Sequence, residues 1–437
     1  MKKVFIETYG CQMNVYDTEL IRGILAQHGD VAFVDDEASA DVVLLNTCAI
    51  RENAHVKVYN RLEQLKPRKR KGKLKAIGIL GCMAQSLRKS LPDDEPMVDI
   101  FAGPDAYKRL PSMLELAVGE DAQATDFSLS EYETYSDVAP SRIPGVNAWI
   151  AIMRGCDNFC TFCVVPYTRG RERSRTLQSV VDEAREAVQS GYKQITLLGQ
   201  NVNSYRTEGH DFADLMAALG ELRGLERVRF TSPHPKDFPL RLLEVMGRYE
   251  NLCKHIHLPL QSGSDSVLER MNRTYTREEY LSLVAQIRAT LPGVSLTTDA
   301  ICGFCGESEA DFDETYQVMQ QVGFDAAFIF KYSERNQTVA SRKYADDVPE
   351  GIKTERVMRL NALQRRVSLA RNRLEIGTEH RVLVERASKK NEHDWFARAD
   401  HFKGVVFSSH DAQPGDIVRV RIDEAYSNTL RGTELPG

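Results

Sequence analysis

The chain has 437 residues, of which 42% are hydrophobic, and a formal net charge of −5 at pH 7. This length predicts roughly three domains, and the composition is ordinary for a soluble globular protein. The sequence contains no long apolar run, which excludes a transmembrane helix, and no apolar segment follows the basic amino terminus as it would in a secretion signal. Nine cysteines without such a signal favour metal ligands or free thiols over disulfides. We therefore expect a cytoplasmic protein with no membrane contact, in which local basic patches decide any binding of nucleic acid.

Residues 2–118 alternate between strand-like and helix-like segments. Strands are predicted at 4–6, 42–45, 76–80 and 98–101, and a helix at 17–26, after which Gly29 marks a stop. Alternation of this kind predicts an α/β domain with a parallel sheet.

Cys11, Cys48 and Cys82 each come directly after one of the first three predicted strands. The carboxyl ends of parallel strands meet at one edge of a sheet, so we expect these cysteines to converge. The pattern predicts a metal cluster held by three cysteines, although three unrelated buried cysteines would also fit it.

Residues 119–147 combine tyrosine, proline and glycine without a clear period, which predicts a linker. Residues 148–375 then return to the alternation of strands and helices. Strands are predicted at 149–153, 194–198, 227–230, 255–258, 295–299 and 326–330, with helices such as 179–189 and 312–321 between them. Six such units predict an open, partial (β/α)6 barrel with its site at the carboxyl ends of the strands.

Cys156, Cys160 and Cys163 form a Cys-x3-Cys-x2-Cys motif directly after the first of these strands. Three thiolates can hold three irons of a four-iron cube, which leaves the fourth iron open to a small molecule. Cys302 and Cys305 form a Cys-x-x-Cys pair without a second pair, so we interpret them, like Cys253, as small buried thiols.

Polar side chains follow the later strands of the predicted barrel. Those we expect to contact a cofactor or substrate are Gln200, Asn201, Gln261, Ser262 and Glu307, although ordinary turn chemistry would explain any one of them. Four arginines, Arg169, Arg171, Arg173 and Arg175, follow the cysteine motif and suit the phosphates of a nucleic acid. A second cationic loop is predicted at 66–73, where a solvated surface is an equal alternative.

The last segment, residues 376–437, changes character. Short strands at 381–385, 395–398, 404–407 and 416–422 predict a small antiparallel β-barrel, a fold that often binds oligonucleotides. Its aromatic residues, Trp395, Phe396, Phe402, Phe407 and Tyr426, could stack on bases, but filling the barrel is the favoured role.

The Cys-x3-Cys-x2-Cys motif resembles that of radical S-adenosylmethionine (SAM) enzymes. Within that group, Thr8–Asn14, Asn46–Arg51 and Gly81–Gln85 resemble the methylthiotransferase family, and the last segment lies where that family has a TRAM domain. The resemblance implies an enzyme with three domains: a methylthiotransferase domain at 2–118, a radical SAM core at 148–375 and an RNA-binding TRAM barrel at 376–437. It also implies two [4Fe-4S] clusters, an auxiliary one on Cys11, Cys48 and Cys82 that carries sulfur, and one on Cys156, Cys160 and Cys163 that cleaves SAM.

The run Cys163–Arg175 is most similar to the branch of the family that acts on isopentenylated adenosine in tRNA. The similarity implies methylthiolation at C2 of N6-isopentenyladenosine next to the anticodon (position 37), on a base that leaves its stack. One SAM would methylate a cluster sulfur, and the adenosyl radical from a second would remove the C2 hydrogen. A tRNA partner, a reductant such as flavodoxin or ferredoxin, and a monomeric state are expected with it.

Three alternatives remain open from the sequence. Related branches act on threonylcarbamoyladenosine or on an aspartate of a ribosomal protein, and a non-catalytic, metal-containing RNA-binding protein would share several of these features. The chain also departs from the family pattern at Arg335–Thr338, where Asn336 and Gln337 stand in place of proline and glycine, and at Cys302 and Cys305.

Overall fold

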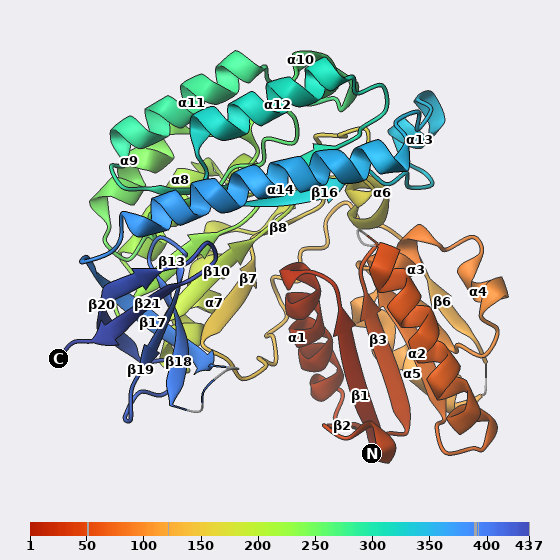
Figure 1. The fold of residues 1–437 in the computed structure, drawn as a ribbon. Coiled ribbons are helices and arrows are strands. Elements are labelled where there is room, and N and C mark those ends of the chain that lie inside the picture. Colours follow the sequence, from red (N-terminus) through yellow and green to blue (C-terminus); the bar gives the residue numbers. More distant parts are fainter. Residues whose placement is uncertain (50–51, 121, 389–390, 392, 437) are drawn as a thin grey trace.

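The computed structural model describes residues 1–49, 52–120, 122–388, 391 and 393–436. The chain folds into three parts in sequence order, and the central part joins the other two, which attach near its opposite ends (Figure 1). Among the described residues, no helix combines the length and the apolar character that crossing a membrane requires.

The first part is a six-stranded sheet in the order β2-β1-β3-β4-β5-β6, with every neighbouring pair parallel. Its strands are β1 (Lys2–Tyr9), β2 (Val31–Phe33), β3 (Val42–Thr47), β4 (Ala76–Gly81), β5 (Ile100–Ala102) and β6 (Ala124–Asp126). Its helices are α1 (Gln12–Gln27), α2 (Glu52–Arg70), α3 (Cys82–Ser86), α4 (Leu91–Asp94) and α5 (Leu110–Gly119), with η1 (Glu37–Ser39) and η2 (Tyr107–Arg109) as short 3-10 turns.

Both faces of this sheet are covered, which explains its unbroken apolar strands. Val42 and Leu44 of β3 face α1 and α5, whereas Val43 and Leu45 face α2. A parallel sheet buried on both faces requires such continuous runs. The predicted parallel α/β domain is therefore confirmed.

Two expectations for this part were wrong. The segment 119–147 is not simply a linker, because β6 extends the sheet and the Tyr135 side chain is fully buried against it, donating a hydrogen bond from Oη to the Pro104 carbonyl at 2.9 Å. Residues 66–70 form the last turn of α2 rather than a loop. The side chains of Lys66, Arg68 and Lys69 there form ion pairs with acidic residues, so much of this cationic run is neutralised.

The central part is an open barrel of six parallel strands with helices outside. The strands are β7 (Asn147–Ala151), β10 (Gln194–Leu198), β13 (Arg227–Phe230), β14 (His255–His257), β15 (Ser295–Cys302) and β16 (Ala326–Lys331). They form two parallel sheets, β13-β10-β7 and β14-β15-β16, and a parallel bridge joins Val228 of β13 to Leu252, which lies just before β14. Within the described chain, β7 and β16 each pair with a single neighbour, so the predicted partial (β/α)6 barrel is confirmed.

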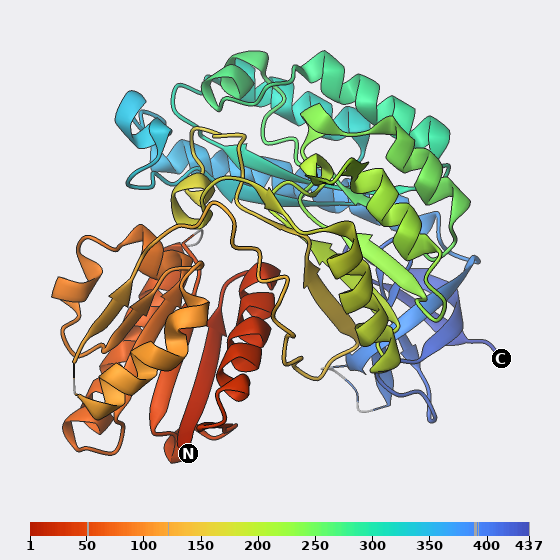
Figure 2. The same cartoon turned by 180° about the vertical axis from the view of Figure 1, so that it is seen from behind.

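Helices surround this barrel, and all of them except α6 and α13 contribute to one continuous apolar core against it. They are α6 (Val165–Arg169), α7 (Leu177–Gln189), α8 (Phe212–Gly220), α9 (Leu240–Arg248), α10 (Asp265–Arg270), α11 (Arg277–Thr290), α12 (Glu309–Val322), α13 (Val339–Lys343) and α14 (Glu350–Arg373). Smaller elements are β8 (Met153–Arg154), β9 (Arg173–Ser174), β11 (Arg206–Thr207), β12 (His210–Asp211), η3 (Val202–Ser204) and η4 (Pro235–Asp237). Figure 2 shows the same arrangement from behind.

The last part is a closed barrel in the order β17-β18-β19-β21-β20. Its strands are β17 (Glu379–Ala387), β18 (Asp394–Ala399), β19 (Gly404–Ser408), β20 (Ile417–Ala425) and β21 (Leu430–Glu434). The barrel is not wholly antiparallel as predicted, because β19 and β21 pair in parallel and β21 was not expected at all. Phe407 fills the barrel interior, whereas the Phe402 and Tyr426 side chains are exposed.

Two arginines of β13 attach this barrel to the central part. Arg227 donates hydrogen bonds from Nη1 and Nη2 to the carbonyls of Arg398 and Arg381, each at 2.6 Å. Arg229 donates from Nη2 to the Ala399 carbonyl at 2.7 Å. Because Arg227 begins β13, the small barrel docks at the amino ends of the strands and leaves the carboxyl ends to the cysteines.

Candidate functional site

Cys11, Cys48 and Cys82 lie at one edge of the amino-terminal sheet, as predicted. Tyr9, Thr47 and Gly81 are register partners on β1, β3 and β4, and each cysteine follows its strand within two residues. A hydrogen bond with Cys48 is the largest influence on Cys11 and lowers the pKa of the Cys11 thiol to about 6. The strand order thus brings these three cysteines together from positions far apart in the sequence.

Asn14 and Asn46 organise this edge. Asn14 Oδ1 accepts a hydrogen bond from Cys11 Sγ at 3.3 Å, and Asn46 Nδ2 donates to the Asn14 carbonyl at 2.8 Å. Gly10 has a φ of +147°, and a Cβ there would lie 2.6 Å from Cβ of Cys48. Only glycine leaves room for the two cysteine-bearing loops to approach each other this closely.

Cys156, Cys160 and Cys163 lie on a loop at the carboxyl end of the first barrel strands, between β8 and α6. Gly155 enters the loop with a φ of +77°, and a Cβ there would lie 2.0 Å from the Arg171 carbonyl. The end of α10 and the residues after it hold this loop, because Thr161 Oγ1 donates to the Arg270 carbonyl at 2.8 Å and Asn272 Nδ2 donates to the Phe159 carbonyl at 3.1 Å. The loop that carries the three thiols is therefore held by hydrogen bonds to a distant part of the chain.

Arg273 is a residue of this site that sequence reasoning missed. Its Nη1 lies 3.3 Å from Cys160 Sγ, its Nε donates to Tyr275 Oη at 3.2 Å, and its buried Nη2 has no hydrogen-bond partner. Burial together with the charge of Arg273 also holds the pKa of His234 well below its usual value, so that ring is neutral. No motif singles out an arginine in the run Met271–Tyr275, so no sequence signal could have found it.

The two groups of cysteines are neighbours in space. Helix α6, which follows Cys163 after a single residue, packs on α3, which begins at Cys82. Val164 forms an apolar cluster with Ala49 and Cys82. Figure 1 shows α6 lying over the end of α3, where the first and central parts meet.

The environment of the thiols suits iron–sulfur clusters. Burial raises the pKa of Cys156 to about 11 and that of Cys163 to about 12, so near neutral pH these thiols keep their protons until a metal displaces them. Among the residues that the structure describes, the only group with the close ligand spacing of a single ion is Glu375, His380 and His401. In a four-iron cube each cysteine binds a different iron, which a wider spacing of sulfurs accommodates.

Glu375, His380 and His401 are better explained as contacts that attach the small barrel to the end of α14 than as a metal site. Glu375 Oε1 accepts from Lys403 Nζ at 2.7 Å, and Glu375 Oε2 lies 3.0 Å from His380 Nε2. The carboxylate already has a cation and a ring N–H as partners. These contacts connect the end of α14 to the small barrel, far along the chain from the cysteines.

The five predicted polar contacts divide into two sets. Gln200 and Asn201 follow β10 at the carboxyl end of the barrel, and each has a buried amide oxygen, Oε1 or Oδ1, without a hydrogen-bond partner. Gln261 has a left-handed backbone conformation with a φ of +63°. Its backbone N–H donates to the carbonyl of Asp299 on β15 at 2.8 Å. A ligand at this end of the barrel would satisfy the two orphan oxygens.

Ser262 and Glu307 are held by neighbouring helices instead. Ser262 Oγ lies 3.2 Å from Thr315 Oγ1 of α12. Glu307 Oε2 accepts from Gly303 N at 2.6 Å and from Arg356 Nη1 of α14 at 2.8 Å. These contacts fix the loops in which the two side chains lie. Glu307 Oε1 nevertheless resembles the amide oxygens of Gln200 and Asn201, because it is buried without a hydrogen-bond partner.

Three of the four arginines predicted to bind RNA are not available to a phosphate. Arg169, Arg173 and Arg175 are buried and form ion pairs with Asp17, Asp105 and Glu183, respectively. Asp17 and Asp105 belong to the amino-terminal part, so these pairs cross the boundary between the two parts. Arg171 alone is exposed, at 2.8 Å from Asp157. The motif therefore serves the domain interface, which is a correction to the sequence interpretation.

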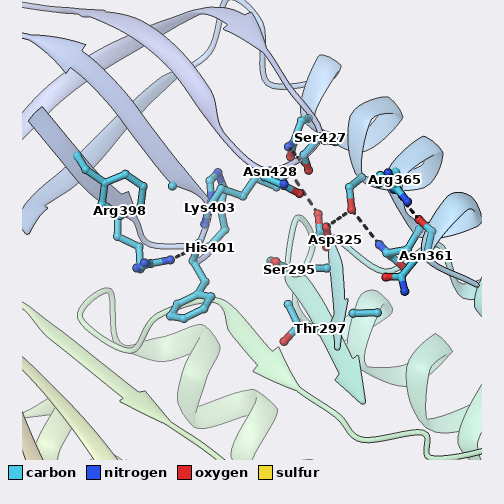
Figure 3. A pocket seen from close by; sticks show the side chains of 18 residues that line it. Ser295, Thr297, Asp325, Asn361, Arg365, Arg398, His401, Lys403, Ser427 and Asn428 are labelled. Atoms are coloured by element: carbon cyan, nitrogen blue, oxygen red, sulfur yellow. Dashed lines mark hydrogen bonds and ion pairs between the residues drawn. The ribbon is translucent and has the colours of Figure 1, made fainter. Parts of the chain in front are cut away.

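A cavity of about 380 Å³ lies elsewhere, where the amino ends of β15 and β16, helix α14 and the small barrel meet (Figure 3). Its labelled side chains come from both parts, with Asn361 and Arg365 on α14 and Arg398 and Lys403 on the small barrel. Asp325 Oδ1 lies within it, 3.3 Å from Lys403 Nζ. This cavity is at the opposite end of the barrel from the cysteines and does not belong to their site.

Family models match all three parts of the chain. Uncharacterized protein family UPF0004 matches residues 3–103, the Radical SAM superfamily matches residues 150–319 and the TRAM domain matches residues 373–435.

Similar proteins extend over nearly the full length of the chain. A tRNA-2-methylthio-N(6)-dimethylallyladenosine synthase from Chloroherpeton thalassium is 47% identical over 99% of this chain and 96% of its own length. The protein of the same name from Bacteroides fragilis is 48% identical, with coverage of 99% and 96%. Among solved structures, the radical S-adenosylmethionine methyltransferase TsrM from Kitasatospora setae, with cobalamin and a [4Fe-4S] cluster bound, aligns with a TM-score of 0.60 and 15% identity over 78% of this chain and 74% of its own. That likeness concerns the fold alone.

Proposed function

The chain belongs to the family of tRNA-2-methylthio-N(6)-dimethylallyladenosine synthases, which are radical SAM methylthiotransferases, and we propose that it inserts a methylthio group at C2 of N6-isopentenyladenosine next to the anticodon of tRNA. The observation that carries this proposal is the pair of three-cysteine groups, one at the edge of the amino-terminal sheet and one on the loop between β8 and α6, brought next to each other by the packing of α6 on α3. One group alone would suit many radical SAM enzymes. The second adjoining group suits the delivery of a sulfur substituent.

The chain's own residues divide the work. Cys156, Cys160 and Cys163 would hold one [4Fe-4S] cluster, and Cys11, Cys48 and Cys82 would hold a second. When bound, SAM and the clusters supply a hydrogen-abstracting radical and the methylthio group. The protein supplies position: three cysteine ligands for each cluster would leave one iron of that cluster open.

Polar groups at the carboxyl end of the barrel would orient the cofactor. The unpaired amide oxygens of Gln200 and Asn201 can accept hydrogen bonds from an ammonium or a hydroxyl group. The unpaired Nη2 of Arg273 can donate to a carboxylate. The aromatic C–H at C2 has no usable acidity, so no general base is required of the chain, and none is assigned.

The tRNA would be held mainly by surfaces outside the cysteine loops. The closed barrel of residues 379–434 is the candidate RNA-binding module, and the exposed Arg171 lies on the loop beside the radical cysteines. A low-potential reductant such as flavodoxin or ferredoxin, a monomeric state and a cytoplasmic location complete the proposal.

The proposal is tested with anaerobically reconstituted enzyme, SAM, dithionite and three tRNA substrates. The tRNAs carry isopentenyladenosine, threonylcarbamoyladenosine or unmodified adenosine next to the anticodon, and nucleosides are analysed by mass spectrometry. Methylthio product from the isopentenylated tRNA alone is the expected result. Product mainly from threonylcarbamoyladenosine would reassign the substrate, and cleavage of SAM with a ribosomal protein but with no tRNA would reassign its class.

A matched control uses Cys253→Ala, which removes a buried cysteine outside both groups. We expect Cys253→Ala to retain iron and product formation, whereas Cys160→Ala or Cys48→Ala abolishes product. A Cys48→Ala enzyme that still forms the methylthio product at the normal rate would contradict the auxiliary cluster.

A further inference from the structure

The junction between the amino-terminal part and the central barrel contains a buried group of charged side chains whose positive and negative charges are not equal in number. Asp17 of α1 is fully buried and lies between two guanidinium groups. Its Oδ1 is 2.7 Å from Arg154 Nη2, and its Oδ2 is 2.7 Å from Arg169 Nη2. One carboxylate and two guanidinium ions leave one positive charge without a counter-ion.

Burying an uncompensated ion is costly, so a folded protein normally supplies a partner. Tyr107 Oη lies 3.4 Å from Asp17 Oδ2, and the ring of Tyr135 lies 4.5 Å from the Arg154 guanidinium carbon, but neither group carries a full negative charge. The nearby Asp105 is taken by Arg173. The counter-ion must therefore come from something other than the carboxylates of this junction.

Arg169 points this surplus charge at the auxiliary cysteines. Its Nη1 is buried and has no hydrogen-bond partner, and its guanidinium lies beside the Cys82 side chain, at the point where α6 packs on α3. Arg169 ends helix α6, which begins two residues after Cys163. A residue from the radical core thus reaches the cysteines of the other domain.

A cluster held by the three thiolates of Cys11, Cys48 and Cys82 would supply the negative charge. Thiolate ligands and bridging sulfides make such a cluster negatively charged, and its sulfurs accept hydrogen bonds that tune its reduction potential. We infer that Arg169 is a positioning residue for the auxiliary cluster: its free Nη1–H donates to a cluster sulfur, and its charge, fixed by Asp17, raises the reduction potential of that cluster. The inference rests on the proposed function in one respect, the assignment of a cluster to Cys11, Cys48 and Cys82.

Two consequences follow from electrostatics. Removing the cation at Arg169 favours the less negative, oxidised cluster, so the potential falls. Neutralising Asp17 leaves both guanidinium groups in place but removes a negative charge near the cluster, so the potential rises. If Arg169 and Asp17 only stabilised the interface, both variants would loosen it. Their reduction potentials would then not shift in opposite directions.

The test isolates the auxiliary cluster in the full-length chain by combining Cys156→Ala, Cys160→Ala and Cys163→Ala. Iron is counted, and the midpoint potential is measured by an electron paramagnetic resonance titration under anaerobic conditions. In this background we expect Arg169→Met to lower the potential by at least 59 mV, which is a tenfold change in a one-electron equilibrium. Asp17→Asn should raise the potential, and Arg169→Lys should recover part of the loss.

Arg175→Met is the matched control. Arg175 is another buried arginine of the same run, and it joins the two parts by donating from Nη1 to Tyr16 Oη at 3.2 Å. It also donates to the Glu183 carboxylate and to the carbonyls of Ala151 and Ser179. It should leave the potential unchanged. Equal shifts in the Arg169→Met and Arg175→Met proteins, or shifts of the same sign in Asp17→Asn and Arg169→Met, would overturn the inference.

The iron count distinguishes a failure of the role of Arg169 from a failure of the auxiliary cluster itself. About four irons in the background protein with no effect of Arg169→Met on potential rejects the role of Arg169 alone. No iron in the background protein rejects the auxiliary cluster and this inference with it. Loss of iron from Arg169→Met but not from Arg175→Met, with recovery in Arg169→Lys, supports the inference even where no potential can be measured.

Discussion

Arg273 Nη1 lies 3.3 Å from Cys160 Sγ, although the two residues are far apart in the sequence. The contact places a permanent cation beside the middle cysteine of the radical motif. Tyr275 Oη, which accepts from Arg273 Nε, in turn donates to the Leu260 carbonyl at 2.7 Å, so the arginine is held in place by the loop after β14. The radical cluster would therefore be supported from the opposite half of the barrel.

We expect Arg273→Met to weaken SAM binding and SAM cleavage by about 10- to 100-fold, the usual effect of removing a group that supports metal ligands. The iron content should change little, because all six cysteines remain. Equilibrium dialysis with SAM and a 5′-deoxyadenosine assay measure the two effects. Arg273→Lys keeps the charge and should recover part of both, and an Arg273→Met protein with normal SAM affinity and cleavage would exclude this role.

Arg229 should be required for docking of the small barrel. Its guanidinium donates to the carbonyls of Ala399 and Asp400 and to Gln194 Oε1, and its guanidinium carbon lies 5.2 Å from the Phe402 ring centroid. Arg229→Met leaves these buried acceptors unpaired, at a cost of about 2–4 kcal/mol in the free energy of unfolding. Denaturant unfolding measures the loss, and limited proteolysis should release the last 60 or so residues earlier than in the unaltered chain. Arg381→Met, which removes an exposed side chain at the same boundary, is the control and should behave as the unaltered chain.

Glu307 should make stability depend on pH. Burial raises the pKa of its carboxyl group to about 7 from an ordinary value of 4.5, against the opposing effects of Gly303 N–H and Arg356. Because the pKa is higher in the folded state, the unfolded chain loses this proton first. The contribution of Glu307 to the free energy of unfolding should therefore be greatest below pH 4.5. It should fall by on the order of 3 kcal/mol between pH 4.5 and 7 and stay constant above pH 7.

The Glu307→Gln protein isolates this effect. The difference in unfolding free energy between it and the unaltered chain should vary with pH across that interval and become constant above it. Glu355→Gln, on the exposed side of α14, should show no such dependence. A difference that is flat from pH 4.5 to 7 would contradict the raised pKa.

Cys302 and Cys305 should prove dispensable for iron. Cys302 packs in the main core of the barrel, whereas Cys305 packs in a separate cluster with Phe304 and Tyr332, so the two thiols serve different apolar environments. The double substitution Cys302→Ala and Cys305→Ala should retain the iron content and product formation of the unaltered chain. It should lower stability by about 1 kcal/mol for each side chain. Loss of iron from this protein, measured by elemental analysis, would give the pair a role as ligands.

Much of the fold followed from local pattern. Runs such as Val42–Leu45 and Ala76–Leu80 predicted buried parallel strands, because only a sheet covered on both faces needs continuous apolar residues. Short strands such as β2, β6 and β21 were not predicted, because a segment of three to five residues is too short to show a clear alternation of apolar and polar side chains. The segment 119–147 was predicted as a linker for the same reason, since the burial of Tyr135 depends on long-range packing.

The six cysteines were determined by the sequence alone: their spacing in the Cys156 motif and their positions after strands are local properties of the chain, and parallel strands must bring their ends to a common edge. The partners of the charged residues were decided only by the tertiary structure. Arg169, Arg173 and Arg175 have the composition of a phosphate-binding run, yet each meets a carboxylate, because the burial of a charge depends on which elements pack against it. Arg273 reaches Cys160 through the same long-range packing, which no short stretch of sequence encodes.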